Sequence, residues 1–582
     1  MPSDAELFYQ TGQPYLGPAP LDAARPAKKR YQAPTRYLER PDAIVIGSGI
    51  GGLGVASLLA QRRGAKVLVL EANIVPGGCT HVHEIDGFEF PSGVDSIGDM
   101  DPRVGRKVNR PNIDYITGGQ LRWAKMPDMH ETVTFGDDTY EWFSSMEKNI
   151  EWIERRFPGE GKKARAYYDL EDHVERRAAA WALTKVYPAW TPESVREAAY
   201  RLIGSPWRRY MHRSLGAVLK GELGFSHRLA SVLGYMYGNL GQVPDRCPFA
   251  AYAMVLFHYR YGAYFPVGGP GQIPECIVPI IEAAGGQVAT HSPVERILVE
   301  NGRAVGVRLG NGEEIRSKLV ISDAGSWNTF VELLDPEISA SLGYPRKYEQ
   351  LEASPPHLYL MLGYDEPIEL PKPIVWHMPY FEGQDPYDIT GNDRRFKDSM
   401  EFAGMPGYIL SPSARDPLHA QRYPGQSTVM VLAEGAHEWV ARCKRDPGFR
   451  AAFEAGATES MTAMAKRHIP ALRGKTPKVV RAGVPIGCNP RSWKGSSYGV
   501  DISGDRWTKH THWLRPKTKI EGLYLTGQDA FAPGMAGAAL GARMTYVAVT
   551  GDVLALLTLG ESPVASAKLL PSRTERPSPQ AA

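Results

Sequence analysis

The chain has 582 residues, of which 43% are hydrophobic, and its formal net charge at pH 7 is +3. This length exceeds one ordinary domain and supplies enough apolar residues for a large core, while the small charge excludes a typical nucleic-acid-binding protein. The five cysteines are Cys79, Cys247, Cys276, Cys443 and Cys488. They are odd in number, widely spaced and without a Cys-x-x-Cys pair, so we expect neither a disulfide framework nor a metal site, and a reducing, intracellular compartment is favoured.

The two ends of the chain differ in composition from the rest. Residues 1–40 are predicted to form an extended N-terminal arm, because they hold several prolines and no apolar stretch of the secretory-signal type. Residues 561–582, rich in proline, serine, alanine and arginine, are predicted to form a disordered tail. No run of about 18 uninterrupted apolar residues occurs, so we expect no transmembrane helix and only peripheral contact with a membrane.

The first nucleotide-binding signal is the sequence GSGIGG at residues 47–52. It follows an apolar run at 43–46 that is typical of a buried strand, and it opens a helix expected over 53–60. A second apolar run, 66–70, ends in Glu71. Strand, glycine turn, helix and a following acid together indicate a dinucleotide-binding βαβ unit, which a glycine motif alone would not.

The positions of this unit have distinct physical roles. Gly47 permits the tight turn, Gly49 lets the backbone approach a pyrophosphate, and Gly52 allows helix and strand to pack closely. The carboxylate of Glu71 lies where it can accept hydrogen bonds from ribose hydroxyls. The other residues of the turn that we assign to cofactor binding are Ser48 and Gly51.

Residues 147–265 are predicted to form a helical cap over a substrate region, because apolar residues recur there at helical spacing, for example over 229–240. Within this cap, residues 207–213 mix aromatic rings with arginines. Such a stretch fits a helix at a lipid headgroup boundary, although a solvated helix face is the favoured interpretation.

Residues 266–345 return to α/β patterning. Strand-like runs separated by Asn-Gly turns predict a small β-meander that closes the adenine side of a flavin site, with the backbone near Val294 as a contact. Residues 346–475 are predicted to form an inserted α+β substrate domain. Two apolar strand-like runs in it, 357–364 and 427–433, suit either the floor of an apolar cavity or an ordinary sheet core.

A second glycine-rich segment, 522–542, lies near the other end of the chain and begins with a strand-like run. Gly527 and Asp529 follow the strand, and a long helix begins at Gly534 and Met535. In a flavin site Asp529 would accept hydrogen bonds from the ribityl hydroxyls. The partial positive charge of the helix N-terminus would stabilise the negative charge of reduced flavin.

Four segments carry a specific resemblance: DAIVIGSGIGGL, PGGCTH leading into GFEFPSGVDSIG, KGSSYGVD, and LRPKTKIEGLYLTGQDAFAPGMAGAALGA. With them the chain resembles the carotenoid isomerase and retinol saturase branch of the phytoene-desaturase-like flavoproteins. The resemblance implies FAD as cofactor and a glutathione-reductase-type, Rossmann-like α/β domain that is discontinuous in sequence. It also implies that Gly77 and Gly78 line the pyrophosphate and the flavin. The segments assigned to this FAD-binding domain are 41–146, 266–345 and 476–560.

The resemblance further implies an apolar polyene substrate, a retinoid or a carotenoid, that reacts at a C=C bond. Saturation, desaturation and isomerisation through reduced flavin all need a dry, elongated tunnel beside the flavin, so the sequence does not separate them. His81, His83 and Tyr498 are candidate proton donors. The choice of substrate stays open, because the chain departs from residues common in relatives at two pocket positions, His83 and Pro91.

Partners and other protein classes are weighed on the same motifs. No second Gly-x-Gly-x-x-Gly with a following strand and acid occurs, so electrons are expected to be exchanged with an external quinone, reductase or oxygen. An amine oxidase would need an aromatic cage near the second glycine segment, where only Phe531 supplies a ring. A prenyl-binding escort protein without redox chemistry would not need Glu71 together with the GQD segment.

Overall fold

The computed structural model describes residues 31–101, 108–186, 192–203, 205–483 and 491–558. The predicted tail at 561–582, and residues 1–30 of the predicted N-terminal arm, lie outside the described residues. The end of the arm lies against the nucleotide-binding part, where the backbone N–H of Leu38 donates to the Gln287 side chain at 2.7 Å.

A five-stranded parallel sheet forms the nucleotide-binding part. Its strands are β1 (Ala43–Ile46), β2 (Val67–Leu70), β9 (Gln287–Ala289), β13 (Val320–Ser322) and β19 (Leu523–Leu525), in the order β19-β13-β1-β2-β9. Short apolar runs of this kind are typical of strands that are covered on both faces. Because the strands come from three separate sections of the chain, the prediction of a discontinuous Rossmann-like domain is confirmed.

Helices cover one face of this sheet and the meander covers the other. On the first face, α2 (Ile50–Arg63) packs against α11 (Gln272–Ala283) and α21 (Gly534–Thr550). The helices α2 and α21 approach closely, because a Cβ on Gly54 would lie 2.9 Å from the Cβ of Ala542. The second face packs against the predicted β-meander, which forms a separate antiparallel sheet of β10 (Val294–Glu300), β11 (Arg303–Leu309) and β12 (Glu314–Arg316).

A seven-stranded mixed sheet forms the predicted substrate part. In sheet order its strands are β18 (Val479–Gly483), β14 (His357–Tyr364), β17 (Ser427–Glu434), β16 (Gly407–Leu410), β15 (Ile374–His377), β6 (Met129–Phe135) and β7 (Asp138–Phe143). All neighbouring strands are antiparallel except β15 and β6. One face of the sheet packs on α14 (Ile389–Ser399), α17 (His437–Arg445) and α18 (Pro447–His468).

The sheet pairings move two of the expected segment boundaries. The segments 41–146 and 476–560 were both assigned to the FAD-binding domain. The strands β6 and β7 lie in the first of them and β18 lies in the second, yet all three strands pair in the seven-stranded sheet. The reason is that membership of a sheet is set by pairing with strands distant in sequence, here β15 and β14, which local patterning does not reveal.

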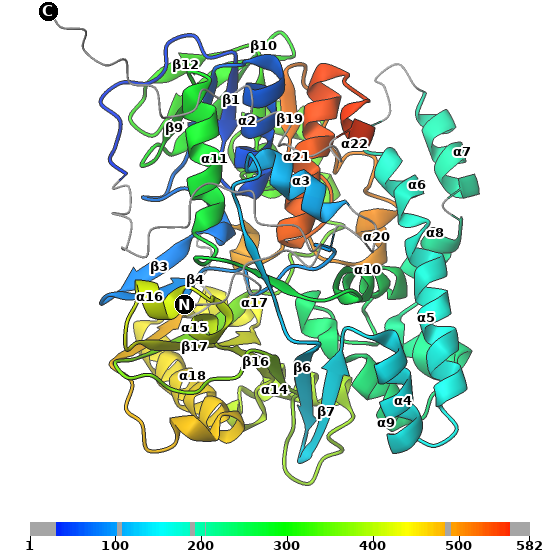
Figure 1. Ribbon diagram of the computed structural model, residues 1–582. Coiled ribbons are helices and arrows are strands. Elements are labelled where there is room, and N and C mark those ends of the chain that lie inside the picture. Colours follow the sequence, from blue (N-terminus) through cyan, green and yellow to red (C-terminus); the bar gives the residue numbers. More distant parts are fainter. Residues whose placement is uncertain (1–30, 102–107, 187–191, 204, 484–490, 559–582) are drawn as a thin grey trace, which may run out of the picture.

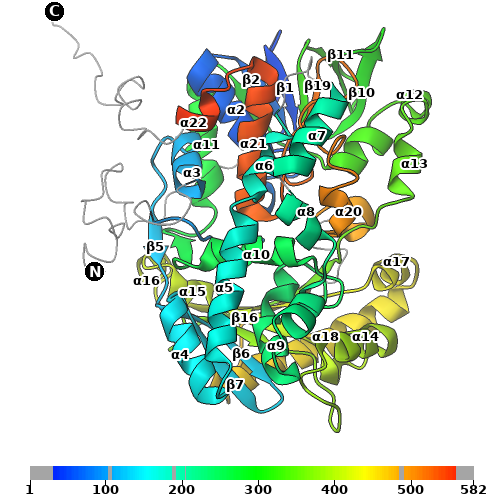
Figure 2. The same cartoon turned by 90° about the vertical axis from the view of Figure 1, so that its right-hand side faces the viewer.

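The segment 146–259, which follows β7 in the sequence, is largely helical. Its helices stand beside both sheets, with α5 along the edge of the molecule (Figures 1 and 2). They are α4 (Met146–Arg156), α5 (Gly161–Glu175), α6 (Ala178–Leu183), α7 (Glu193–Ile203), α8 (Ser205–Met211), α9 (His227–Leu233) and α10 (Phe249–Tyr259).

The structure contradicts a lipid-facing interpretation of residues 207–213. Trp207, Tyr210 and Met211 are buried in the core of the cap, and the Trp207 ring lies 6.1 Å from that of Trp181. These rings cannot reach a membrane, because the apolar side of α8 packs inward. Among the described residues, no helix combines the length and apolarity that crossing a membrane requires.

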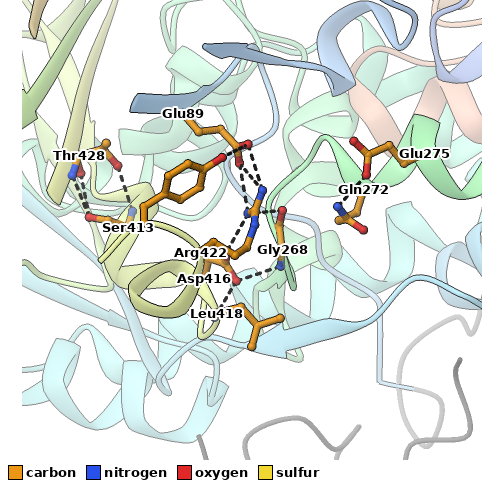
Figure 3. Close-up of polar contacts among 10 residues, drawn as sticks. Glu89, Gly268, Gln272, Glu275, Ser413, Asp416, Leu418, Arg422 and Thr428 are labelled. Carbon is orange, nitrogen blue, oxygen red and sulfur yellow. Dashed lines mark hydrogen bonds and ion pairs between the residues drawn. The ribbon is translucent and has the colours of Figure 1, made fainter. Parts of the chain in front are cut away.

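A buried ionic network joins the nucleotide-binding and substrate parts (Figure 3). Arg422, at the end of α16 (His419–Arg422), lies 3.0 Å from Glu89 of β4 (Phe88–Pro91) and 3.3 Å from Asp416. Asp416 in turn accepts from the backbone N–H of Gly268 at 2.9 Å, and the Tyr423 hydroxyl donates to Glu89 at 2.7 Å. All three charged side chains are at least nine-tenths buried.

Replacing Arg422 with methionine is expected to lower the free energy of unfolding by about 3–5 kcal/mol, because the buried Glu89 and Asp416 would lose the ion pairs that Arg422 makes with them. Guanidinium unfolding followed by tryptophan fluorescence measures the change. The matched control is Arg316→Met, whose ion pairs involve a side chain that is 54% exposed and should contribute under about 1 kcal/mol.

Adding Glu89→Gln and Asp416→Asn to Arg422→Met should recover part of the loss, because the triple variant leaves no buried charge uncompensated. If Arg422→Met alone is as stable as Arg316→Met, this network does not hold the two parts together.

Candidate active site

The two glycine-rich turns lie side by side at the carboxyl ends of β1 and β19, the two strands that flank β13. A Cβ on Gly51 would lie 2.5 Å from the Cα of Gly527, closer than a Cβ comes to backbone. The Thr526 hydroxyl also donates a hydrogen bond to the Gly51 carbonyl at 3.4 Å. Segments separated by more than 400 residues in sequence therefore form one surface.

A cavity of about 760 Å³ begins at these turns and reaches the seven-stranded sheet. Its volume is in the range of small-molecule and cofactor sites. At the far end its wall is apolar and aromatic, formed by Tyr359, Tyr408, Met430 and Leu432 of β14, β16 and β17. The sequence-predicted residues that line the cavity are Gly47, Ser48, Gly49, Gly51, Glu71, Gly78, Val294, Tyr498, Asp529, Gly534 and Met535.

Three predicted glycines lie behind the lining and shape the turns. A Cβ on Gly52 would lie 2.2 Å from the carbonyl oxygen of Gly47. Gly77 and Gly527 have φ angles of +120° and +78°, a backbone conformation that residues with a side chain rarely adopt. Their part in the site is the backbone geometry of the turns.

Glu71 is buried at the end of β2, with 5% of its surface exposed. Oε2 accepts hydrogen bonds from the backbone N–H and the hydroxyl of Ser48 at 2.9 and 2.6 Å, and Oε1 accepts from the Asn73 N–H at 2.7 Å. These bonds hold the carboxylate at the cavity wall beside the first turn. This position fits an acceptor for the adenosine ribose of FAD.

Asp529 is buried behind the second turn. Oδ2 accepts from the backbone N–H and the hydroxyl of Ser326, both at 2.8 Å, and Oδ1 accepts from the Val500 N–H at 3.1 Å. The Arg506 guanidinium lies 3.7 Å from Oδ1 and is itself buried. The network connects the GQD segment (527–529) to the KGSSYGVD segment (494–501). It fixes the Asp529 carboxylate where ribityl hydroxyls are expected.

Two helices begin at the cavity, and both starts suit a negatively charged cofactor. The N-cap of α2 is Gly49 and that of α21 is Pro533, and neither supplies a side-chain cap. Backbone N–H groups at such helix starts attract anions. The residues present therefore fit FAD: the first turn would hold its pyrophosphate, Glu71 its ribose and Asp529 its ribityl chain, and α21 would begin near its flavin.

The sequence analysis missed Asp323, which follows β13 and lies against the first turn. Its carboxylate oxygens are so close that a Cβ on Gly49 or Gly51 would come within 2.5 or 2.4 Å of them. The motif VISDAG could have indicated this residue, because an acid at the carboxyl end of a parallel strand lies at the same sheet edge as the glycine turn.

The protonation of Asp323 bears on cofactor binding. Burial raises the pKa of Asp323 to about 7, and the nearby carboxylates of Glu71 and Asp529 add to the rise, while the N–H groups of Gly52 and Gly49 lower it. An ionised Asp323 would compete for, and repel, a pyrophosphate at the same N–H groups. FAD binding should thus favour the protonated form.

We expect FAD affinity to be constant well below pH 7 and to fall, by up to about tenfold per pH unit, as the pH rises through 7. Asp323→Asn should remove this dependence and tighten binding at pH 8. Titration of the apoprotein with FAD, followed by flavin fluorescence, gives the dissociation constants. An unchanged pH profile in Asp323→Asn would assign the dependence to another group.

The three candidate proton donors lie in different places. Tyr498 lines the cavity, and burial, with Asp95 as the next cause, raises its pKa so that the phenol stays protonated. His81 and His83, next to and within β3 (Val82–Ile85), are not among the lining residues; their rings lie 4.7 Å apart. Burial lowers the pKa of both, that of His83 to about 4, so both imidazoles are neutral at pH 7. A catalytic role for any of the three stays a prediction.

His357 is a second residue that the sequence analysis did not single out. It opens β14 and lines the cavity, its Nδ1 lies 2.6 Å from the Ser497 hydroxyl, and its ring meets Tyr498 edge-on at 5.7 Å. Burial lowers its pKa to about 4, so it is neutral at pH 7. A lone histidine at a strand start carries no sequence signal, because its neighbours come from a distant segment.

Comparison with known proteins gives one family model and several similar proteins. Residues 45–110 match the model of the NAD(P)-binding Rossmann-like domain. The chain is 32% identical over 536 residues to all-trans-retinol 13,14-reductase of Danio rerio, covering 87% of this chain and 86% of that protein. It is 31% identical over 316 residues to the chloroplastic prolycopene isomerase of Daucus carota, covering 50% and 47%.

Solved structures share the fold at low sequence identity. An oxidoreductase from Methanosarcina mazei has a TM-score of 0.53 at 19% identity, covering 86% of this chain and 98% of that one. Putrescine oxidase has a TM-score of 0.56 at 14% identity, covering 89% and 100%. At such identities the likeness concerns the architecture alone.

Proposed function

Because this chain belongs to the all-trans-retinol 13,14-reductase family, we propose that it reduces one C=C bond of a retinoid or carotenoid polyene. The chain is an oxidoreductase and its cofactor is FAD. The observation that carries the proposal is that one cavity runs from the dinucleotide turns to an apolar, aromatic wall. A cofactor at the turns and a polyene at the wall would meet inside it.

The residues of the cavity would supply binding and a proton. Reduced FAD would supply a hydride and become oxidised; saturation of a C=C bond needs this hydride and one proton, so the product gains two hydrogens. Tyr498 would donate the proton from its protonated phenol, with His357 beside its ring as a positioning residue. Tyr359, Tyr408, Met430 and Leu432 would hold the polyene and exclude water.

A second candidate function is isomerisation of a carotenoid without net redox change, favoured by the similarity to prolycopene isomerase over half the chain. The amine-oxidase alternative has no such support in the site. Phe531 is the ring that an aromatic cage would use. It is buried, its ring centroid lies 4.9 Å from that of Trp181, and it does not line the cavity. The electron partner is proposed to be external, a reductase, a quinone or oxygen.

Purified holoprotein, reduced under anaerobic conditions and incubated with all-trans-retinol and with carotenoids, tests the proposal. Mass spectrometry of the products is expected to show a gain of two hydrogens in one polyene. A product of unchanged mass with altered geometry would favour the isomerase, and a protein that stays colourless after FAD addition would overturn the enzyme assignment.

A further inference from the structure

A second, smaller cavity adjoins the apolar wall of the first. Its volume is about 20 Å³, and residues of β15, β16, β17 and the cap contribute to its lining. Most of the lining is apolar or aromatic, formed by Tyr237, Trp376, Met378, Pro406 and Ala433. The acidic residue of the lining, Glu434, is ion-paired with Lys397 at 3.1 Å. The second cavity therefore continues the apolar character of the first.

Three residues line both cavities and lie between them: His357, Tyr408 and Leu432. Tyr408 and Leu432 are register partners on the neighbouring strands β16 and β17, so their side chains lie on the same face of the sheet. Trp376 is the register partner of Tyr408 on β15, and it lines the second cavity but not the first. Tyr408 and Leu432 thus form a partition across the sheet.

The partition has a rigid support on the side of the second cavity. The Tyr408 ring packs against the ring of Trp376, with centroids 4.8 Å apart. Trp376 is buried, and its ring N–H donates to Glu131 at 3.1 Å. The cap covers the same ring closely, because a Cβ on Gly238 would lie 3.1 Å from it. Trp376 therefore cannot give way when a ligand presses on Tyr408.

We propose that Tyr408 is a stop that sets the length of polyene this site accepts, an inference that rests on the proposed function. A polyene that runs from the flavin along the apolar wall meets the Tyr408 ring at the boundary of the first cavity. A longer chain would have to bend or displace the ring, and one methylene too many in an apolar pocket lowers affinity by about 10- to 200-fold. Without the ring the two cavities would join, and the chain end would enter the second.

Two polyenes that differ only in length test the stop: all-trans-retinol and a homologue whose chain is longer by one isoprene unit. Their dissociation constants for the FAD-loaded protein follow from quenching of tryptophan fluorescence. The unaltered protein should bind the homologue at least about 10-fold more weakly than retinol. In Tyr408→Ala this difference should disappear, because the homologue binds more tightly. A gain in affinity cannot result from a misfolded variant.

Two further variants serve as controls, and flavin absorbance shows whether each is folded and loaded. Tyr408→Phe keeps the ring and should keep the difference between the polyenes, which separates the stop from any hydrogen bond of the hydroxyl. Tyr359→Ala is the matched truncation. Tyr359 is the register partner of Leu432 on β14, and it lines the first cavity but not the second. Its loss should alter affinity for both polyenes without removing their difference.

Equal affinity of the unaltered protein for the two polyenes, or an unchanged difference in Tyr408→Ala, would overturn the stop. A difference that Tyr359→Ala removes equally well would assign the limit to cavity volume and overturn it too. If mass spectrometry shows that the unaltered protein reduces both polyenes equally well, the proposed function stands and the stop fails. If the unaltered protein binds neither, the proposed function fails and the stop with it.

Discussion

Gly51→Ala is expected to yield a folded protein that binds FAD at least about 100-fold more weakly. The new Cβ would meet the Cα and N atoms of Gly527 at 2.5 and 2.7 Å, and these backbone atoms cannot rotate away as a side chain would. The two turns would have to separate, and the N–H groups and carboxylates that they position would move with them. Flavin absorbance of the purified variant and titration of its apoprotein with FAD measure the loss.

The control for this prediction is Gly221→Ala. A Cβ on Gly221 meets nothing within 4 Å, so this variant should bind FAD normally. Alanine also has a higher helix propensity than glycine, so a defect in Gly51→Ala cannot be assigned to a weakened α2. Full FAD occupancy in Gly51→Ala would show that contact between the turns is not required.

Tyr498→Phe is expected to lower turnover of the polyene by about 100- to 10,000-fold while FAD content and polyene affinity stay unchanged. The substitution keeps the ring that packs beside His357 and removes only the phenolic proton. Because burial holds the pKa of Tyr498 above its ordinary value, no loss of activity through ionisation of this group is expected near neutral pH. Single-turnover kinetics with reduced FAD separates the chemical step from binding.

His81→Gln and His83→Gln are the comparison variants, since both histidines were candidates on the sequence. They lie outside the cavity lining and should have smaller effects on turnover. If either variant loses more activity than Tyr498→Phe, the proton donor has been assigned to the wrong residue.

The nucleotide-binding part follows from the sequence because its signals are local. Strand, glycine turn, helix and Glu71 occupy one continuous stretch, and the GQD segment repeats the same pattern of strand, turn and helix. Gly51 must be a glycine because a Cβ there would collide with the backbone of Gly527. Gly527 has a φ of +78°, and a Cβ on it would collide with the Asp323 carboxylate.

The substrate end depends on contacts between distant segments, which the sequence did not reveal. His357, at the start of β14, lies against Ser497 and Tyr498, which are more than 100 residues away in the sequence. The histidines after the GGC turn show the converse. Proximity in sequence suggested that they reach the flavin, but the β3–β4 hairpin pairs His83 with Phe90 outside the cavity lining.

A single turnover under anaerobic conditions, with the bound FAD reduced beforehand, tests the central claim most directly, because it separates net reduction of a C=C bond from isomerisation. Mixed with the proposed polyene, the flavin should become oxidised in one-to-one proportion to the polyene consumed, and the product should carry two additional hydrogens. Consumption of the polyene while the flavin stays reduced and the product mass is unchanged would contradict the account.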